Sequence, residues 1–210
     1  MASRKKSVDF ILEQCDGLSA RAEKGKKMKK VIVIGCPGSG KTTFAEKLGA
    51  ATKLPLYHLD AIWHKPDRTH IERSEFDERL AQVMQLDEWI IDGNYSRTLE
   101  TRLKSCDTVF LFDLPTEVCL QGATDRLGKG RYDVPWIDTE LSPQFKNEIE
   151  SFPQMVLPKV YELLERYKDG KTVVVFKSRE QADAFLSDSN SGLLTENPGG
   201  QADPRLRWRG

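Results

Sequence analysis

The feature that most constrains this chain is an eight-residue loop sequence. Residues 35–42 read Gly-Cys-Pro-Gly-Ser-Gly-Lys-Thr, which fits the spacing G-x-x-x-x-G-K-[ST] at every defined position. From average residue usage, a chance match in a chain of this length is on the order of 1%. The loop follows the apolar run Val31–Ile34, which is typical of a strand buried on both faces, and it precedes a stretch of helical character over 41–50. A strand, a glycine-rich turn and a helix in this order predict a site that binds phosphate groups.

The chemistry of this loop follows from its residue types. Glycine lets backbone N–H groups approach an anion closely, and the positive end of the following helix adds to the attraction. We expect the Lys41 ammonium to reach the β- and γ-phosphates of a nucleotide and the Thr42 hydroxyl to ligate Mg²⁺. The alternative, a glycine-rich turn without a ligand, gives no reason for a Lys-Thr pair after the loop. We therefore predict that ATP is bound together with Mg²⁺ by Gly35, Pro37, Gly38, Ser39, Gly40, Lys41, Thr42 and Thr43.

The rest of the hydrophobic pattern predicts an α/β fold. Apolar runs typical of strands alternate with stretches of helical character and with breakers such as Pro115. Such alternation implies a five-stranded parallel sheet with helices on both faces. The predicted strands are 31–34, 54–59, 89–91, 108–112 and 173–176. The predicted helices are 41–50, one with Ser74 as its N-cap, 116–127, 142–167 with breaks at Pro153 and Pro158, and 178–186.

The chain divides into three parts by composition. Residues 28–187 carry the alternating pattern and are predicted to form one domain. Residues 1–27 carry apolar residues at helical spacing followed by lysines, and we interpret them as a helical extension or a fusion remnant. Residues 188–210 are rich in Ser, Asn, Gly, Pro and Gln, which predicts a disordered tail. Whether the two extensions are native is left open by the sequence.

Composition disfavours several classes of protein. The chain has 32 basic and 32 acidic residues, so its formal net charge is zero, which makes DNA a possible but not a favoured partner. No apolar run is long enough to span a bilayer and no signal peptide is visible, so we expect a cytoplasmic protein without a membrane partner. Cys15, Cys36, Cys106 and Cys119 form no Cys-x-x-Cys pair, and we interpret them as scattered reduced thiols.

Carboxylates follow three of the predicted strands. Asp60, Asp92 and Asp113 each come at the end of an apolar run. In an open parallel sheet, ligands bind beyond the carboxyl ends of the strands. These side chains are therefore candidates for the same site as the phosphate loop.

Three segments carry a resemblance to a known family. Residues 55–60 (PLYHLD), 89–98 (WIIDGNYSRT) and 107–115 (DTVFLFDLP) resemble the bacterial adenylate-kinase-like proteins that are often labelled DNA topology modulation proteins. With the phosphate loop, the resemblance spans about residues 28–187. It implies a nucleoside-monophosphate-kinase-like P-loop NTPase fold with an ATP site, an acceptor site and a helical lid region.

The resemblance implies roles for particular side chains. Asp92 would hold magnesium through water, or cap a turn, and Asp60 would orient or deprotonate an acceptor hydroxyl, or cap a helix. Arg97 would hold the acceptor phosphate or the transferring group, or be a surface arginine. Arg126 and Arg131 flank Gly128-Lys129-Gly130, where the lid is expected. They would neutralise the charge of the moving phosphoryl group, with the glycine pair as a hinge, unless this stretch is an ordinary loop.

The chain also departs from adenylate kinases. Residues 61–66 (AIWHKP) stand where those enzymes carry an AMP-binding loop, so AMP is not the favoured acceptor. Trp63 and His64 there would stack on a base, line a different pocket, or pack in the core. The spacing of His58, His64 and His70 does not suit a metal site on one helical face.

Two functions remain open at this stage. The first is a phosphotransferase that moves the γ-phosphoryl group of MgATP to a small-molecule or nucleotide acceptor, with Lys41, Asp60, Arg97, Arg126 and Arg131 in catalytic roles and Thr42 and Asp92 at the metal. The second is an ATP-binding regulator of DNA or of a protein partner, in which hydrolysis is slow or incidental. The sequence does not reveal the acceptor or the oligomeric state.

Overall fold

The computed structural model describes residues 28–131 and 133–187, and its centre is a parallel β-sheet. Five strands pair in the order β2-β3-β1-β4-β5, and every pair is parallel. The predicted extensions 1–27 and 188–210 lie outside the described residues. The predicted five-stranded parallel α/β fold is confirmed.

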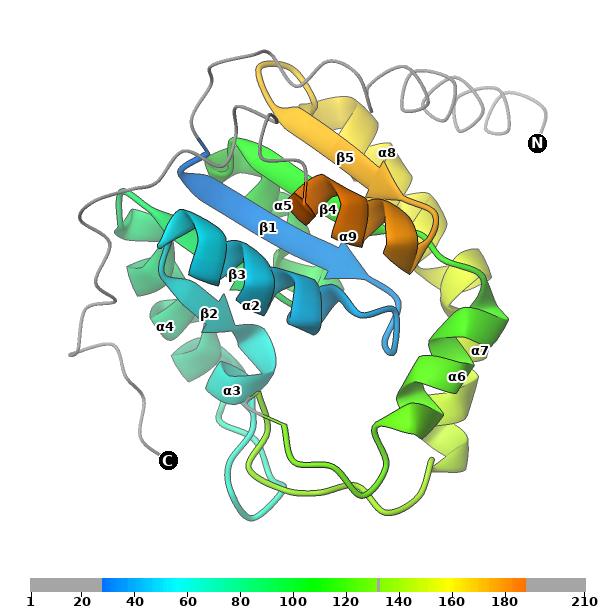
Figure 1. Cartoon of the computed structure of the whole chain (residues 1–210). Coiled ribbons are helices and arrows are strands. Elements are labelled where there is room, and N and C mark those ends of the chain that lie inside the picture. The colour runs from blue at the N-terminus through cyan, green and yellow to red at the C-terminus, as the bar shows by residue number, and fades with distance from the viewer. Residues whose placement is uncertain (1–27, 132, 188–210) are drawn as a thin grey trace.

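The strands and helices alternate along the chain (Figure 1). The strands are β1 (Lys30–Gly35), β2 (Leu56–His58), β3 (Trp89–Asp92), β4 (Thr108–Phe112) and β5 (Thr172–Phe176). The helices are α2 (Lys41–Thr52), α3 (Leu59–Trp63), α4 (Arg73–Gln85), α5 (Ser96–Ser105), α6 (Thr116–Asp125), α7 (Pro143–Met155), α8 (Leu157–Tyr167) and α9 (Arg179–Ser187).

Helices cover both faces of the sheet, and each face has its own apolar core. Helices α2 and α9 lie on one face, while α4, α5 and α8 lie on the other (Figure 1). Phe44 of α2 packs in T-shaped contacts on Phe110, Phe112 and Phe176 of the sheet, with ring centroids 4.9 to 5.3 Å apart. Burial of such apolar area on both faces is what makes the strands read as continuous hydrophobic runs.

Helices α6 and α7 stand apart from the two layers. They pack against each other beyond the carboxyl ends of β1 and β4 (Figure 1). The stretch between them, from Arg126 to Ser142, contains turns and bends but neither helix nor strand in its described residues. The helical lid region expected from the sequence therefore consists of two helices joined by a loop.

Several predicted boundaries shift. Ser74 is not an N-cap, because α4 begins at Arg73, and Glu72 takes the N-cap position without a side-chain cap bond. The predicted helix over 142–167 divides at Val156, while Pro153 stays inside α7. Ser142 does cap α7, since its hydroxyl oxygen accepts a hydrogen bond from the Phe145 N–H at 3.2 Å.

Two helices were not predicted from the sequence. Helix α3 has only five residues, which is too short for a periodic pattern to be recognised. Helix α5 buries Thr98 and Arg102 beside Leu99 and Leu103, so its inner face is half polar. A pattern search for apolar residues at helical spacing misses such a helix.

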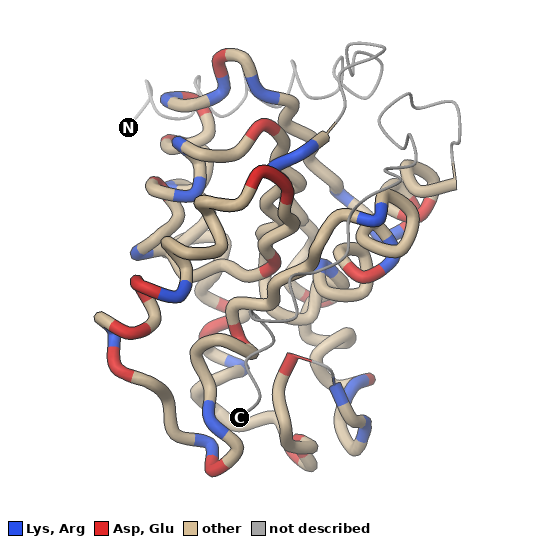
Figure 2. The backbone as a smooth tube through the Cα atoms, turned by 90° about the vertical axis from the view of Figure 1, so that its left-hand side faces the viewer, with Lys and Arg blue, Asp and Glu red and all other residues tan. Residues whose placement is uncertain are grey.

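Charged residues of both signs are interspersed over the described chain. Figure 2 shows lysines and arginines alternating with aspartates and glutamates along most of the backbone. No helix among the described residues is long and apolar enough to cross a membrane.

Candidate active site

The phosphate loop joins β1 to α2 and is shaped by its glycines. Gly35, Gly38 and Gly40 have φ angles of 148°, 78° and 100°, which side-chain-bearing residues rarely adopt. Gly40 is the N-cap of α2, and that helix has neither a side-chain cap nor an acidic residue in its first turn. The N–H groups of the first turn of a helix have no intrahelical acceptors. The loop therefore offers several backbone donors and the positive end of a helix to an anion.

The backbone of the phosphate loop packs directly against helix α6 at Gly38. A Cβ atom at Gly38 would lie 2.1 Å from the carbonyl oxygen of Cys119, and one at Gly122 would lie 2.2 Å from the carbonyl oxygen of Gly38. Neither position has room for a side chain, because the two backbones touch directly. This close packing limits how far the loop can move relative to α6.

Arg179, at the start of α9, clamps the loop from the side of β5. Its guanidinium donates to the carbonyl oxygens of Gly38 at 2.9 Å, Ser39 at 3.3 Å and Val118 at 3.2 Å. Arg179 thereby ties two carbonyls of the phosphate loop and one of α6 to the start of α9. Sequence reasoning missed Arg179, because nothing in its local pattern links it to a loop that lies 140 residues earlier in the chain.

A turn after β3 supports the other side of the loop. The Asn94 side chain accepts from the Gly35 N–H at 3.1 Å and donates to the Gly35 carbonyl at 2.8 Å. Arg102 of α5 is fully buried and donates to the carbonyl oxygens of Gly93, Asn94 and Tyr95. Burial lowers the pKa of Arg102 to about 10. One buried arginine thus shapes the turn that anchors the first residue of the phosphate loop.

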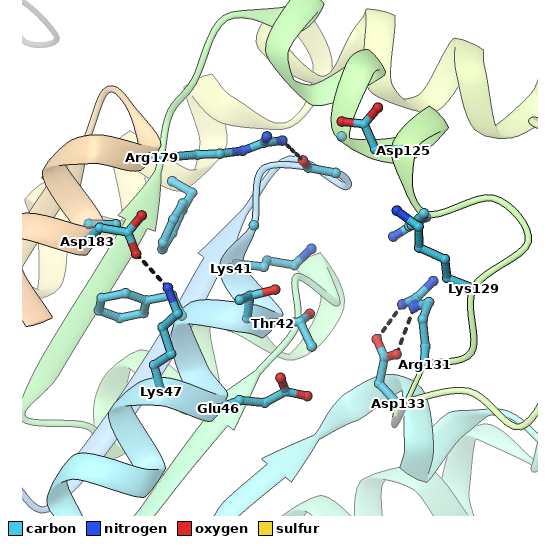
Figure 3. A pocket seen from close by; sticks show the side chains of 18 of the residues that line it. Lys41, Thr42, Glu46, Lys47, Asp125, Lys129, Arg131, Asp133, Arg179 and Asp183 are labelled. Carbon is cyan, nitrogen blue, oxygen red and sulfur yellow. Dashed lines mark hydrogen bonds and ion pairs between the residues drawn. The ribbon is translucent and has the colours of Figure 1, made fainter.

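A cavity of about 510 Å³ opens in front of the phosphate loop. Figure 3 shows Lys41 and Thr42 extending into it from α2, while Lys129 and Arg131 extend from the opposite, lid side. Thr43, Gly38 and Gly40 also line it, with Phe44, Phe112 and Ala182 as its apolar surfaces. Lys47, near its edge, pairs with Asp183 at 2.7 Å. We call it the nucleotide cavity.

A second cavity, of about 720 Å³, lies between the loop, α3 and the lid. Pro37, Asp60, Trp63, His64, Asn94 and Tyr95 are among its lining residues, together with Trp136 and Phe145. We call it the acceptor cavity. Lys41, Arg126 and Arg131 line both cavities, so the two meet at a point that three cationic side chains surround.

Two of these cations lie close enough to affect each other. Burial lowers the pKa of Arg126, and the charge of Arg131 lowers it further. The guanidinium of Arg126 packs over the Phe145 ring, 4.9 Å from its centroid. Burial also acts to lower the pKa of Arg131, but the ion pair with Asp133 outweighs it and the pKa is raised. An anion bound between Arg126 and Arg131 would relieve their mutual repulsion.

Asp60 lies at the edge of the acceptor cavity, in the first turn of α3. Its carboxylate accepts a hydrogen bond from the Tyr95 hydroxyl at 2.9 Å. The Arg131 guanidinium lies 3.8 Å from its other oxygen. Both contacts leave the carboxylate partly exposed to the cavity, where it can accept a proton or a hydrogen bond from a bound hydroxyl group.

Asp92 ends β3 directly beside β1, opposite Val33 in the register. Its Oδ2 atom lies 3.0 Å from Nδ1 of His58, while its Oδ1 atom is buried without a hydrogen-bond partner. Burial lowers the pKa of His58, but its hydrogen bond to Asp92 and the charge of that carboxylate outweigh the burial, so the pKa is raised. A buried carboxylate oxygen without a hydrogen-bond partner among the described residues is the kind of ligand that Mg²⁺ prefers, although Asp92 itself lines neither cavity.

Magnesium would depend on the nucleotide for the rest of its ligands. Among the described residues, no group of three or more His, Cys, Asp and Glu side chains is positioned to hold a metal ion. Mg²⁺ commonly binds to proteins through one or two side chains plus substrate phosphates and water. Thr42 and Asp92 are oxygen-bearing candidates for the protein's share of those ligands.

Arg97 is the sequence-predicted site residue that the structure does not bring to the others. Its guanidinium forms a two-point ion pair with Asp77 of α4, at 2.8 and 2.6 Å. About half of each side chain is exposed, and Arg97 lines neither cavity. Because its guanidinium is already paired with Asp77 on the surface, Arg97 is not part of the candidate site. Ser39, also predicted, is fully buried within the loop and contributes backbone to it.

Asp113, the third strand-end carboxylate, has a structural role. It accepts hydrogen bonds from the Tyr161 hydroxyl at 2.6 Å and from the Lys177 ammonium at 2.5 Å. These contacts join the end of β4 to α8 and to the turn after β5.

Comparisons with known proteins add only general likeness. No protein-family model matches the chain, and no curated protein matches it. Among solved structures, a shikimate kinase from Bacteroides thetaiotaomicron is 14% identical over 76% of this chain and 95% of that chain, with a TM-score of 0.47. A gluconokinase from Sinorhizobium meliloti 1021 is 14% identical over 80% of this chain and 93% of that one, with a TM-score of 0.43. Because these scores are low, we draw no functional argument from them.

Proposed function

We propose that this protein is a phosphotransferase that moves the γ-phosphoryl group of ATP to a small-molecule acceptor. One observation carries the proposal: the nucleotide cavity and the acceptor cavity meet at Lys41, Arg126 and Arg131. A protein that only bound ATP would need the first cavity alone. Cations at the junction of two cavities suit a charge that moves from one to the other.

The chemical step can be written with the residues at this junction. A hydroxyl oxygen of the acceptor attacks the γ-phosphorus, and the bond between that phosphorus and the β–γ bridging oxygen breaks. The electron pair of that bond leaves with ADP. The proton of the acceptor hydroxyl passes to the Asp60 carboxylate, which the Tyr95 hydroxyl holds in place.

Positioning and charge neutralisation supply most of the rate enhancement in such reactions. Lys41 would contact the β- and γ-phosphates, while Arg126 and Arg131 would neutralise the oxygens of the moving group from the lid side. The α2 N-terminus holds the remaining phosphate oxygens by its N–H groups. Thr42 and Asp92 would hold Mg²⁺, which supplies further neutralisation of the phosphates when bound.

The experiment that tests the proposal is the Lys41→Ala variant. We expect ATP-dependent phosphoryl transfer to fall by about 10³-fold, because one fixed cation at the phosphates contributes about 4 kcal/mol. Calorimetry should show a parallel loss of MgATP affinity. The thermal unfolding midpoint should not change, because Lys41 extends into the cavity and not into the core.

Lys47→Ala is a matched control, because Lys47 lines the same cavity but is already paired with Asp183. Its effect on MgATP affinity should stay below about threefold, as for exposed ion pairs. Unchanged MgATP affinity in Lys41→Ala would contradict the proposal.

A further inference from the structure

The charges of the acceptor cavity are unlike those of a site for a phosphorylated acceptor. Apart from the three cations at the junction, its described lining residues include one cationic side chain, Arg68. Four carboxylates line the same cavity, those of Asp60, Asp138, Glu140 and Glu148. Burial lowers the pKa of His64, so this histidine adds little positive charge. If the three junction cations bind the transferring phosphoryl group, a second phosphate elsewhere in the cavity would face four carboxylates and one arginine.

The arginines that could offset this are engaged elsewhere. Arg68 donates to the carbonyl oxygen of Ile137 at 3.3 Å, and its guanidinium lies over the Trp136 ring, 5.6 Å from the centroid. It thereby joins the 64–70 turn to the lid. Arg97, the residue expected to hold an acceptor phosphate, is bound to Asp77 outside the cavity. Phosphate recognition normally uses paired arginine donors, and beyond Arg126 and Arg131 at the junction the described lining of the acceptor cavity offers no second pair.

The remaining lining is aromatic. Trp63 stacks on His70 with ring centroids 4.4 Å apart, and Trp136 meets His64 edge to face at 5.1 Å. Both indoles also line the acceptor cavity, as does Tyr95. Ring faces of this kind bind the flat or apolar face of a sugar ring or a base, and carboxylates accept hydrogen bonds from hydroxyl groups.

From these features we propose that the acceptor is an uncharged, hydroxyl-bearing ring compound, a sugar or a nucleoside, and not a phosphorylated metabolite such as a nucleoside monophosphate. The inference rests on the proposed phosphotransferase function and names its substrate class. The hydroxyl nearest Asp60 receives the phosphoryl group and gives its proton to that carboxylate. The other carboxylates accept hydrogen bonds from further hydroxyls, and they disfavour an acceptor that already carries a phosphate.

The test compares acceptors in pairs that differ only by a phosphate. With the full-length chain and MgATP, acceptor-dependent ADP release is measured for the common nucleosides against their 5′-monophosphates. The same is done for free pentoses and hexoses against their phosphates. We expect an uncharged member to be used at least about tenfold better in kcat/KM than its phosphorylated partner. The two arms also distinguish a nucleoside from a sugar.

A failure of this inference can be told apart from a failure of the proposed phosphotransferase function. Absence of MgATP binding would remove the proposed function itself. MgATP binding with preferential use of a phosphorylated acceptor, or with no uncharged acceptor used in either arm, would overturn this inference alone.

A double variant tests the same point from the protein side. Glu140→Gln with Glu148→Gln removes two carboxylates from the acceptor cavity, and both side chains are exposed enough to be replaced without disturbing the core. We expect the preference for the uncharged acceptor to narrow by at least about threefold, since repulsion of the phosphate falls. Glu78→Gln with Glu150→Gln, on exposed surface outside both cavities, is the control and should leave the preference unchanged. Equal effects from the two double variants would count against the inference.

Discussion

The phosphate loop and the lid loop both bend at glycines with left-handed backbone, yet their surroundings are opposite. Gly38 has a φ of 78° and Gly128 a φ of 73°. A Cβ at Gly38 would collide with the backbone of α6, whereas no atom of the described residues lies within 4 Å of a Cβ at Gly128. The loop that binds phosphate is therefore held by direct backbone packing. The loop that carries Arg131 lacks such backbone packing at Gly128 and is held instead by side-chain contacts such as the Arg131–Asp133 ion pair.

The difference in packing matches a difference in task. A loop that always binds the same phosphate groups benefits from preorganisation, because no binding energy is then used to order the loop. A group that must admit and release different molecules needs space to move. Variants in the two loops, at the proposed metal site and at the Arg131–Asp133 ion pair would test this difference.

The largest effect should come from adding one methyl group to each loop. Gly38→Ala should destabilise the protein by about 3 kcal/mol or more, because left-handed strain is combined with a clash against the Cys119 carbonyl. Gly128→Ala should cost only about 1 kcal/mol, the strain alone. Urea unfolding of both variants measures the difference. If the two variants lost the same free energy of unfolding, the packing of Gly38 against α6 would make no measurable contribution to stability.

A smaller effect is expected at the metal. If Asp92 helps to hold the ion as proposed, Asp92→Asn should raise the magnesium concentration needed for half-maximal activity by about tenfold, because a neutral amide replaces the carboxylate. Asp138→Asn, a neutral replacement in the acceptor cavity, should leave that midpoint unchanged. Magnesium titrations of ATP turnover provide the comparison, and coincident midpoints for Asp92→Asn and the wild type would exclude Asp92 from the metal site.

The smallest effect concerns the anchor of the lid loop. Burial acts to raise the pKa of Asp133, but the ion pair with Arg131 outweighs it and holds the pKa below the usual 3.8. The stability from this pair is therefore complete above pH 3.8 and is lost as the pH falls through the lower pKa of the folded protein. Wild type should be more stable than Asp133→Asn at pH 6, and the difference should shrink at pH 3. Urea midpoints that differ equally at both pH values would contradict this.

The sequence predicted the sheet and the phosphate loop well because both depend on local patterns. Fully buried strands such as Thr108–Phe112 read as continuous apolar runs, and the loop has a fixed spacing of glycines before a lysine. The strand-end position of Asp92 follows from the same pattern, since parallel strands end at one edge of the sheet.

What the sequence did not predict depends on contacts between distant segments. Arg179 and Asn94 support the phosphate loop from far along the chain, and no local pattern marks either of them. Arg97 was expected in the site because it follows the Asp-Gly pair closely, but the first turn of α5 directs it toward Asp77 on the surface. Arg102, in the same helix, occupies the buried position that an apolar residue would normally fill.

The direct contact between Gly38 and Gly122 has a consequence for how substrates enter. Because the middle of α6 has no clearance from the phosphate loop, that part of the helix cannot swing outward without distorting the loop itself. Residues 126–131 are less tightly packed, since no described atom lies within 4 Å of a Cβ added at Gly128 or Gly130, so we expect any opening of the two cavities to occur there. Residues 126–131 would move while the phosphate loop stays in place. The phosphate loop would then have the same conformation when ATP binds and when ADP leaves.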